Sequence, residues 1–139
     1  MVELLQTEGY CGFTKIVIVD NLSNSSAVCL ERMQTITGKV NSMVVFEEVD
    51  ICHESVLDDV FTRHGPIKSV IHFAGLKAVG ESVRMPMKYY ENNVGGTISL
   101  LKCMLKHGCK NMVFSSSATL YGDQLECTED KPICPTNPY

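Results

Sequence analysis

Apolar runs alternate along this chain with segments whose apolar residues recur every three or four positions. The runs are short and rich in β-branched residues, which predicts strands at Lys15–Val19, Ser42–Val49, Ser69–Phe73 and Asn111–Ser115. The helical periodicity predicts helices at Ser26–Thr37, His53–Arg63 and Pro86–His107, the last of them stopped by Gly108. The proline-rich tail from Asp123 to Tyr139 is predicted to be loop.

Each predicted helix has an apolar side. It comprises Leu30, Met33 and Ile36 in the first, Val56, Leu57, Val60 and Phe61 in the second, and Tyr90, Val94, Ile98, Leu101 and Leu105 in the third. Strands that alternate with helices and are apolar throughout predict an α/β fold, with a Rossmann-like, doubly wound parallel sheet covered on both faces. Ligands of such folds bind beyond the carboxyl ends of the strands, so the residues that follow each strand form the candidate site.

Acidic residues follow the first two predicted strands. In dinucleotide-binding folds a carboxylate in the position of Asp20 accepts hydrogen bonds from the adenosine ribose, and its charge repels a 2′-phosphate. The carboxylate of Asp50 can accept a hydrogen bond from the adenine amino group. Both residues also fit capping roles, Asp20 in a turn rich in Asn and Ser, and Asp50 before the helix that starts near His53. The residues alone leave these alternatives open.

Small and hydroxyl-bearing residues follow the other two strands. Ala74 and Gly75 lack bulk, so a cofactor can pass close over the strand end, and Lys77 then has a reason to point inward. Without those small neighbours, a lysine in a loop is usually solvated. The run Ser115–Ser117 closes the last predicted strand, where a hydroxyl can share a proton with a tyrosine and a substrate hydroxyl. The alternative is a serine-rich turn.

Composition narrows the function classes. The chain has 139 residues, 45% of them hydrophobic, which allows at most one domain. A net charge of −4 without a basic run argues against nucleic acid as a partner. Apolar stretches such as Ile16–Val19 are far shorter than the roughly 20 residues of a membrane span, and the first ten residues do not resemble a signal peptide.

Cysteine is unusually frequent for so short a chain. The seven residues are Cys11, Cys29, Cys52, Cys103, Cys109, Cys127 and Cys134, with no Cys-x-x-Cys pair among them. We interpret them as reduced, partly buried thiols of a cytosolic protein. A disulfide framework or a zinc site is disfavoured, and no metal site is expected.

Together the strand-end motifs resemble the UDP-glucose 4-epimerases of the extended short-chain dehydrogenase/reductase family. The similar segments run in order along nearly the whole chain, at Asp20–Ser25, Asp50-Ile51, Phe73–Ser82, Tyr89–Thr97, Phe114–Gly122 and Thr136–Tyr139. The block Ala-Gly-Leu-Lys-Ala-Val-Gly-Glu-Ser is close to diagnostic of this family, whereas Asp-Ile or Asn-Pro-Tyr alone would be weak.

The resemblance implies NAD as cofactor and a role for each matching residue. The segment around the adenosine ribose is matched by Asp20, Asn21, Leu22, Ser23, Asn24 and Ser25, and the adenine contact by Asp50 and Ile51. The segment under the diphosphate and the nicotinamide ribose is matched by Phe73, Ala74, Gly75, Leu76 and Lys77, and a further cofactor contact by Asn92. Ser117 matches a residue that bridges the sugar O4 and the catalytic tyrosine at the cofactor, and Tyr139 matches that tyrosine.

The implied reaction, in galactose metabolism, interconverts UDP-glucose and UDP-galactose through transient NAD-dependent oxidation at C4 of the sugar. The tyrosine must ionise near neutral pH, well below its usual pKa of about 10. In the family, the positive charge of NAD and a lysine four residues after the tyrosine lower that pKa.

That lysine, the first strand, the glycine-rich diphosphate loop and the substrate domain have no counterpart in this sequence. We therefore expect residues 1–139 to be a partial NAD-binding Rossmann domain, inactive on its own. The parent protein is expected to be cytoplasmic and homodimeric, with Pro86–His107 among the interface helices.

Two rival interpretations stay open. A nucleotide-sugar 4,6-dehydratase would carry an Asp-Glu pair where this sequence has Ala118-Thr119, which cannot do that acid–base work. A non-catalytic NAD-fold protein, used for binding or regulation, is favoured by the missing loop and lysine. It is disfavoured by the presence of Ser117 and Tyr139. The residues do not decide whether N-acetylated UDP-hexoses are also substrates.

Overall fold

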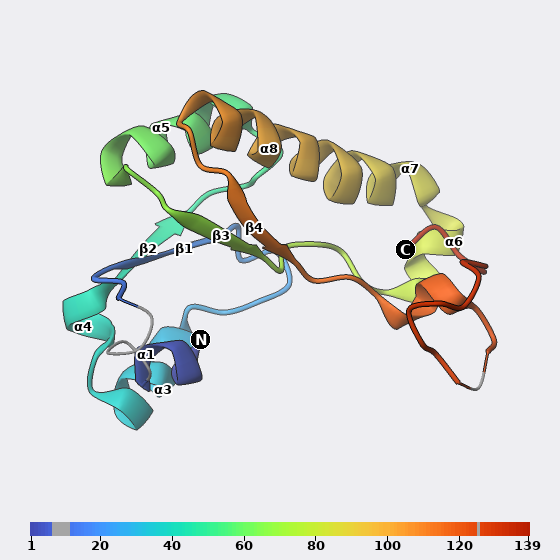
Figure 1. Cartoon of the computed structure of the whole chain (residues 1–139), viewed down its shortest axis with the longest axis horizontal. Helices are drawn as coiled ribbons and strands as arrows, with labels where there is room; N and C mark the ends of the chain where they lie inside the picture. The colour runs from blue at the N-terminus through green and yellow to red at the C-terminus, as the bar shows by residue number, and fades with distance from the viewer. Residues whose placement is uncertain (7–11, 125) are drawn as a thin grey trace. The chain divides into compact units, whose positions relative to one another are not determined.

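The computed structural model describes residues 1–6, 12–124 and 126–139. The chain divides into two compact units, Met1–Ile51 and Cys52–Tyr139. Each unit contains a two-stranded sheet, and helices join or flank the strands (Figure 1). Both sheets are parallel, which confirms the α/β, Rossmann-like class that the alternation of strands and helices predicts.

The first unit is built on strands β1 (Ile16–Asp20) and β2 (Val44–Glu48), which pair in register from Ile16↔Val44 to Asp20↔Glu48. Its helices are α1 (Val2–Gln6), α3 (Val28–Thr37) and α4 (Val40–Met43). Helix α3 contacts both α1 and α4. Leu5 of α1 is fully buried, and its carbonyl oxygen accepts a hydrogen bond from Lys39 Nζ at 3.0 Å. This contact fastens α1 to the turn between α3 and α4.

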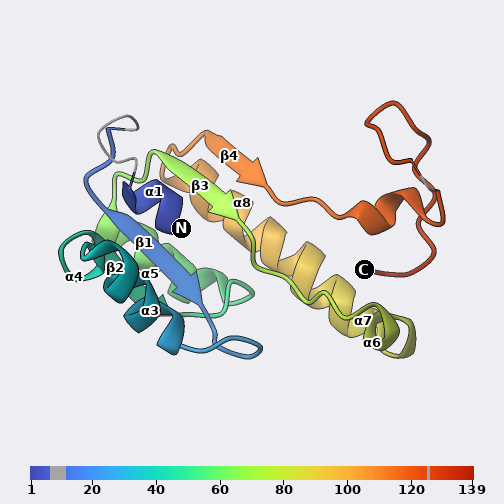
Figure 2. The same ribbon diagram turned by 90° about the horizontal axis from the view of Figure 1, so that it is seen from below.

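The second unit is built on strands β3 (Ser69–His72) and β4 (Asn111–Phe114), whose arrows point the same way in Figure 2. A bond from Ser115 N to His72 O, at 3.1 Å, extends the pairing past the end of β4. Helix α5 (Glu54–His64), the short helix α6 (Val79–Arg84) and the 3₁₀ turn η2 (Ala118–Tyr121) also belong to this unit. The carboxyl ends of β3 and β4 therefore lie at one edge of the sheet.

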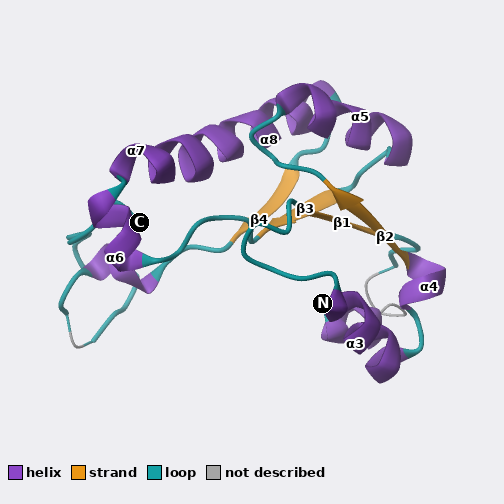
Figure 3. Cartoon of the chain, turned by 180° about the vertical axis from the view of Figure 1, so that it is seen from behind, coloured by secondary structure: helices purple, strands orange, loops and turns teal. Residues whose placement is uncertain are grey.

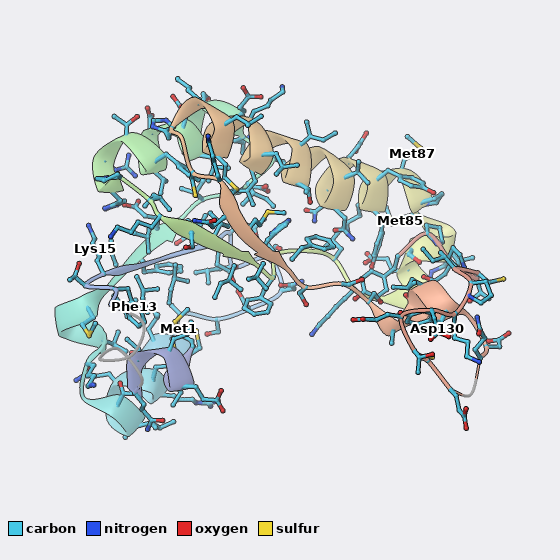
Figure 4. All side chains as sticks on the ribbon, in the orientation of Figure 1. Met1, Phe13, Lys15, Met85, Met87 and Asp130 are labelled. Carbon is cyan, nitrogen blue, oxygen red and sulfur yellow. The ribbon has the colours of Figure 1, made fainter. Side chains whose placement is uncertain are left out.

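A long rod of helix crosses the second unit. It consists of α7 (Pro86–Tyr89), the π-helical segment η1 (Tyr90–Gly95) and α8 (Gly96–Lys106), which follow one another without a break. Helices α5 and α8 pack side by side on one face of the β3–β4 sheet (Figure 3). At the start of the rod, the side chains of Met85 and Met87 are exposed (Figure 4).

The core of the second unit lies between α5, α8 and the sheet. It contains Leu57, Val60 and Phe61 of α5 and Leu100, Cys103 and Met104 of α8. Ion pairs border it, with Lys102 Nζ 2.8 Å from Glu54 Oε2 and Lys106 Nζ 2.6 Å from Asp58 Oδ2. Hydrogen bonds from Lys106 and then His107 lower the pKa of Asp58.

The predicted elements are confirmed to within a few residues, except that the strand predicted from Ser42 begins at Val44 and the short helices α4 and α6 were not predicted. The apolar side that the sequence predicts for the long helix does not face the core. Its members, Tyr90, Val94, Ile98, Leu101 and Leu105, are between 39% and 76% exposed. The buried positions are Tyr89, Gly96, Ser99, Leu100, Cys103 and Met104. The long helix therefore carries a second apolar side, with Leu100, Cys103 and Met104, and it is this side that packs in the core beside α5.

Two smaller predictions about helix faces also need correction. Helix α3 has no buried residue, and Ile36 on its predicted apolar side is 61% exposed. On α5, Leu57, Val60 and Phe61 are buried as predicted, whereas Val56 is 43% exposed.

Within residues 1–6, 12–124 and 126–139, no helix is both long enough and apolar enough to span a bilayer. The cysteines in these ranges are free thiols, and Cys11 lies outside them.

Candidate functional site

In the first unit, the loop that leaves β1 is organised by the carboxylate of Asp20. Its Oδ1 accepts hydrogen bonds from Leu22 N and from Ser25 Oγ, both at 2.8 Å. Leu22 has a φ of 54°, a left-handed conformation uncommon for a branched residue, which turns the chain sharply after the strand. Within the described residues no hydrogen bond to Oδ2 of Asp20 is formed. That oxygen can accept a hydrogen bond from a ligand hydroxyl.

A side-chain bond joins the ends of the two strands of this unit. Asn21 Nδ2 donates to Asp50 Oδ2 at 2.9 Å, and Asn21 Oδ1 accepts from Ser23 N at 3.1 Å. The structure therefore brings the predicted segments Asp20–Ser25 and Asp50-Ile51 together at one sheet edge. Neither carboxylate caps a helix, since α3 and α5 have no side-chain cap. Asp20 does hold a turn, through Leu22 N.

In the second unit, the backbone that leaves β3 is held by Asn93 of η1. Asn93 Oδ1 accepts from Leu76 N at 2.8 Å, and Asn93 Nδ2 donates to Leu76 O at 2.9 Å. Gly75 also lies against the Asn93 side chain, since a Cβ added there would be 3.4 Å from Asn93 Oδ1, an ordinary van der Waals contact. Phe73, which precedes this bend, is 72% exposed, and so its ring is available to a ligand.

Lys77 and Asn92 keep polar groups available beside this bend. The exposed side chain of Lys77 forms no hydrogen bond or ion pair within the part of the chain that the structure describes. Asn92 Nδ2 donates to Asn93 Oδ1 at 2.8 Å, which places Asn92 next to the Leu76 contact. Asn93 was not among the predicted site residues. A signal was present in the spacing of Tyr89, Asn93 and Thr97, polar residues four positions apart on one helix.

His72, the last residue of β3, is buried and continues this network. Its Nε2 lies 2.9 Å from Thr97 Oγ1, and Thr97 Oγ1 donates to Asn93 O at 2.6 Å. Because the threonine hydrogen is used on Asn93 O, the histidine must donate through Nε2. Burial lowers the pKa of His72, which favours this neutral form.

The end of β4 carries the predicted catalytic serine. Ser117 caps the 3₁₀ turn η2, since its Oγ accepts from Thr119 N at 3.2 Å and lies 2.8 Å from Thr119 Oγ1. A bond of 2.8 Å from Cys134 N to Leu120 O attaches the C-terminal tail to η2. Tyr139, at the end of that tail, is half-buried. Within residues 1–6, 12–124 and 126–139, no hydrogen bond joins Ser117 to Tyr139, and the Ser117 hydroxyl is bonded to Thr119.

Comparison with known proteins finds similar sequences and structures among nucleotide-sugar enzymes. The sequence profile of the family described as GDP-mannose 4,6 dehydratase matches residues 1–139. A UDP-glucose 4-epimerase of Dictyostelium discoideum is 53% identical over 141 residues, covering 100% of this chain and 38% of the relative. The UDP-glucose 4-epimerase of Bacillus subtilis is 52% identical over 140 residues, covering 99% of this chain and 39% of the relative.

Solved structures agree with these relatives. UDP-glucose 4-epimerase from Bifidobacterium longum, in complex with NAD⁺ and UDP, has a TM-score of 0.86 and 48% identity, covering 99% of this chain and 39% of that one. The enzyme from Stenotrophomonas maltophila, with bound NAD and formylated UDP-arabinopyranose, has a TM-score of 0.84 and 41% identity, with the same coverage. This chain thus spans less than two fifths of the length of these proteins. It belongs to the family described as GDP-mannose 4,6 dehydratase, and within that family it is similar to the UDP-glucose 4-epimerases.

Proposed function

We propose that the protein containing this chain is a UDP-glucose 4-epimerase, which binds NAD and interconverts UDP-glucose and UDP-galactose. The observation that carries the proposal is the similarity to UDP-glucose 4-epimerases along the whole chain, at 53% and 52% identity in two of them. In this proposal residues 1–139 are part of the NAD-binding Rossmann domain, and the substrate domain lies in a further part of the protein.

The residues present fit NAD. In the first unit, Asp20 offers an unused carboxylate oxygen to a ribose hydroxyl, and Asp50 lies at the same sheet edge beside Asn21. In the second unit, Gly75 leaves room above the strand end and Lys77 supplies a cation for a diphosphate. These hydrogen-bonding and charged groups suit a ligand that has hydroxyl groups and negative charge. The remaining predicted contacts, Leu22, Ser23, Asn24, Ser25, Ile51, Phe73, Ala74, Leu76 and Asn92, line these two segments.

The chemistry of this chain's own residues is proton transfer. Bound beside these residues, NAD would supply a reversible acceptor for the hydride at C4 of the sugar. The phenol oxygen of Tyr139 takes the proton of the sugar 4-hydroxyl, and Ser117 passes that proton between the sugar and the tyrosine. Thr119 orients the serine hydroxyl through the 2.8 Å contact between the two oxygens. A positioned proton carrier typically accelerates such a step about 10²–10⁴-fold.

The rival dehydratase function is disfavoured although the family bears that description. Elimination of water from the sugar needs an acid and a base beyond the tyrosine, and the resemblance places them at Ala118 and Thr119. Alanine has no titratable group. The threonine hydroxyl is already engaged with Ser117. Neither side chain can supply the carboxylate that elimination requires.

The proposal includes a cytoplasmic homodimer. The apolar stripe Tyr90, Val94, Ile98, Leu101 and Leu105 is exposed along the rod of η1 and α8, and burial of such a stripe against a second copy would stabilise a dimer. Light scattering on the intact protein should give twice the mass of one subunit. A monomer at micromolar concentration would contradict this part of the proposal.

The test uses the whole chain joined at both ends to the flanking segments of the Bacillus subtilis relative, here called the completed protein. We expect it to interconvert UDP-glucose and UDP-galactose and to bind NAD. Tyr139→Phe should nearly abolish turnover while NAD stays bound, and Ser117→Ala should lower turnover about 10²–10⁴-fold. Tyr121→Phe, at the half-buried last residue of η2, is the matched control and should leave turnover unchanged.

A double-mutant cycle separates the two roles. Because both residues serve one proton path, the losses from Ser117→Ala and Tyr139→Phe should be less than additive. Cofactor occupancy, read from absorbance, shows whether a loss comes from the chemical step or from binding. Strictly additive losses would mean that the residues act separately, and near-normal turnover in Tyr139→Phe would overturn the proposed function.

A further inference from the structure

Lys77 lies between two residues whose backbone groups are both held by side chains. On one side, Leu76 N and Leu76 O are bonded to the amide group of Asn93, at 2.8 and 2.9 Å. On the other side, Ala78 N donates to the hydroxyl oxygen of Tyr89 at 3.1 Å, and that hydroxyl lies 2.9 Å from Ala78 O. Leu76 thus has its donor and its acceptor held by one side chain. Ala78 has its donor held by Tyr89, while its carbonyl oxygen also accepts a helical bond from Ser82 N at 2.9 Å.

Helix geometry explains how one rod holds both residues. Tyr89 ends α7, and Asn93 lies four positions further along, in the π-helical segment η1. The hydrogen bonds show that both side chains face the segment from Leu76 to Ala78. Thr97 lies one further turn along the helix. Its Oγ1 donates to Asn93 O and lies beside His72 Nε2, so the backbone of Asn93 is held as well.

The tyrosine is also held in place. Tyr89 is 1% exposed, and its hydroxyl lies 2.8 Å from Glu81 Oε2, which is paired with Lys88 Nζ at 2.8 Å. Burial, and then the hydrogen bond with Glu81, raise the pKa of Tyr89, so the phenol stays neutral and keeps its proton. Because the phenol is buried, neutral and bonded to a carboxylate, it offers the Ala78 backbone a hydrogen-bond partner whose position is fixed.

We propose that Asn93 and Tyr89 are positioning residues for Lys77, which they hold so that its ammonium group is directed at the NAD cofactor. The inference rests on the proposed function, because it needs NAD beside Lys77. The side chains of Asn93 and Tyr89 are both occupied with the backbone, and Lys77 is the group left without a partner in the described residues. Fixing the backbone on both sides reduces the entropy that the lysine loses on binding.

The test measures NAD affinity and backbone exchange in the completed protein. Asn93→Leu keeps the size of the side chain and removes both bonds to Leu76, and Tyr89→Phe keeps the buried ring and removes the bonds to Ala78. We expect amide hydrogen exchange to accelerate at Leu76 in the first variant and at Ala78 in the second. Since one net hydrogen bond corresponds to about a 2- to 12-fold change, each variant should weaken NAD binding roughly 3- to 10-fold.

Lys77→Met decides whether the two residues act through the lysine. In that background Asn93→Leu and Tyr89→Phe should each weaken NAD binding less than about twofold, because the group that they position is gone. Glu91→Gln, an exposed neighbour on the same π-helical segment, is the control and should change neither readout. Asn93→Asp, which keeps the acceptor for Leu76 N and loses the donor, replaces Asn93→Leu if the leucine variant does not fold.

Three outcomes are decisive. Full weakening by Asn93→Leu in the Lys77→Met background would mean that Asn93 acts on the cofactor without the lysine, and would overturn the inference. Faster exchange at Leu76 with unchanged NAD affinity would overturn it as well. Failure of the unchanged completed protein to bind NAD would instead refute the proposed function, and the inference would fall with it.

Discussion

Gly122→Ala is the perturbation that most directly tests how the tail carrying Tyr139 is held. Gly122 follows η2 with φ 65° and ψ −133°, a region almost closed to residues with a Cβ, at a cost of about 1–3 kcal/mol. A Cβ there would overlap the carbonyl oxygen of Cys134. The tail must then move, which breaks the bond from Cys134 N to Leu120 O and costs about 0.5–1.5 kcal/mol more.

Together these terms amount to roughly 1.5–4.5 kcal/mol of local stability. Since about 1.4 kcal/mol is tenfold, hydrogen exchange at the Cys134 amide should accelerate at least about tenfold in the completed protein. Turnover should fall too, because Tyr139 lies five residues beyond Cys134 on the same tail. Exchange is measured residue by residue, so the tail can be followed apart from the core.

Gly108→Ala is the matched control for backbone strain alone. Gly108 has φ 70° at the end of α8, and a Cβ there would meet nothing within 4 Å. We expect a cost of about 1–2 kcal/mol, confined to the end of that helix. If Cys134 exchange in Gly122→Ala does not exceed that in Gly108→Ala, the contact between Gly122 and Cys134 does not hold the tail, and the reasoning is refuted.

Two further predictions concern the cofactor and pH. Asp20→Ala should weaken NAD binding about 10- to 100-fold in calorimetry, because hydrogen bonds to a charged group contribute about that much, and it should reduce discrimination against NADP. A preference of the unchanged protein for NADP would contradict the role of Asp20. His72 has a pKa lowered by burial, so the unfolded chain binds its proton more readily. The contribution of His72 to the free energy of unfolding in urea should therefore be complete above about pH 6.5 and decline as the pH falls below it. His72→Gln should flatten that decline, and an unchanged pH profile in this variant would exclude the histidine as the cause.

The ends of the strands could be predicted from sequence because the signals there are local. Asp20 and Gly75 follow an apolar run directly, and Ser117 ends the serine run that follows another. Polar or small residues in such places are informative without knowledge of the fold. The structure adds that the loops after β1 and β3 are tied down by hydrogen bonds, through Asp20 Oδ1 and through Asn93. Those strand positions are predictable because sheet pairing depends on short contiguous runs.

The polar side of the long helix could not be predicted in the same way. Asn93 bonds to the backbone of Leu76, 17 positions away, and backbone groups leave no side-chain pattern for a sequence reading to match. Apolar residues occur on two sides of this helix, so their periodicity alone does not tell which side is buried. The structure buries Leu100, Cys103 and Met104 and leaves the other stripe exposed.

The contacts between Tyr89 and the backbone of Ala78 limit which substitutions this chain can accumulate. Tyr89 contacts the N–H and C=O of Ala78; every residue has the C=O, and every residue except proline has the N–H. The exposed side chain at this position takes no part. Variation at position 78 is therefore constrained by backbone chemistry and not by side-chain identity: an alignment of natural relatives could show many residues there, while proline stays excluded and the tyrosine opposite stays fixed.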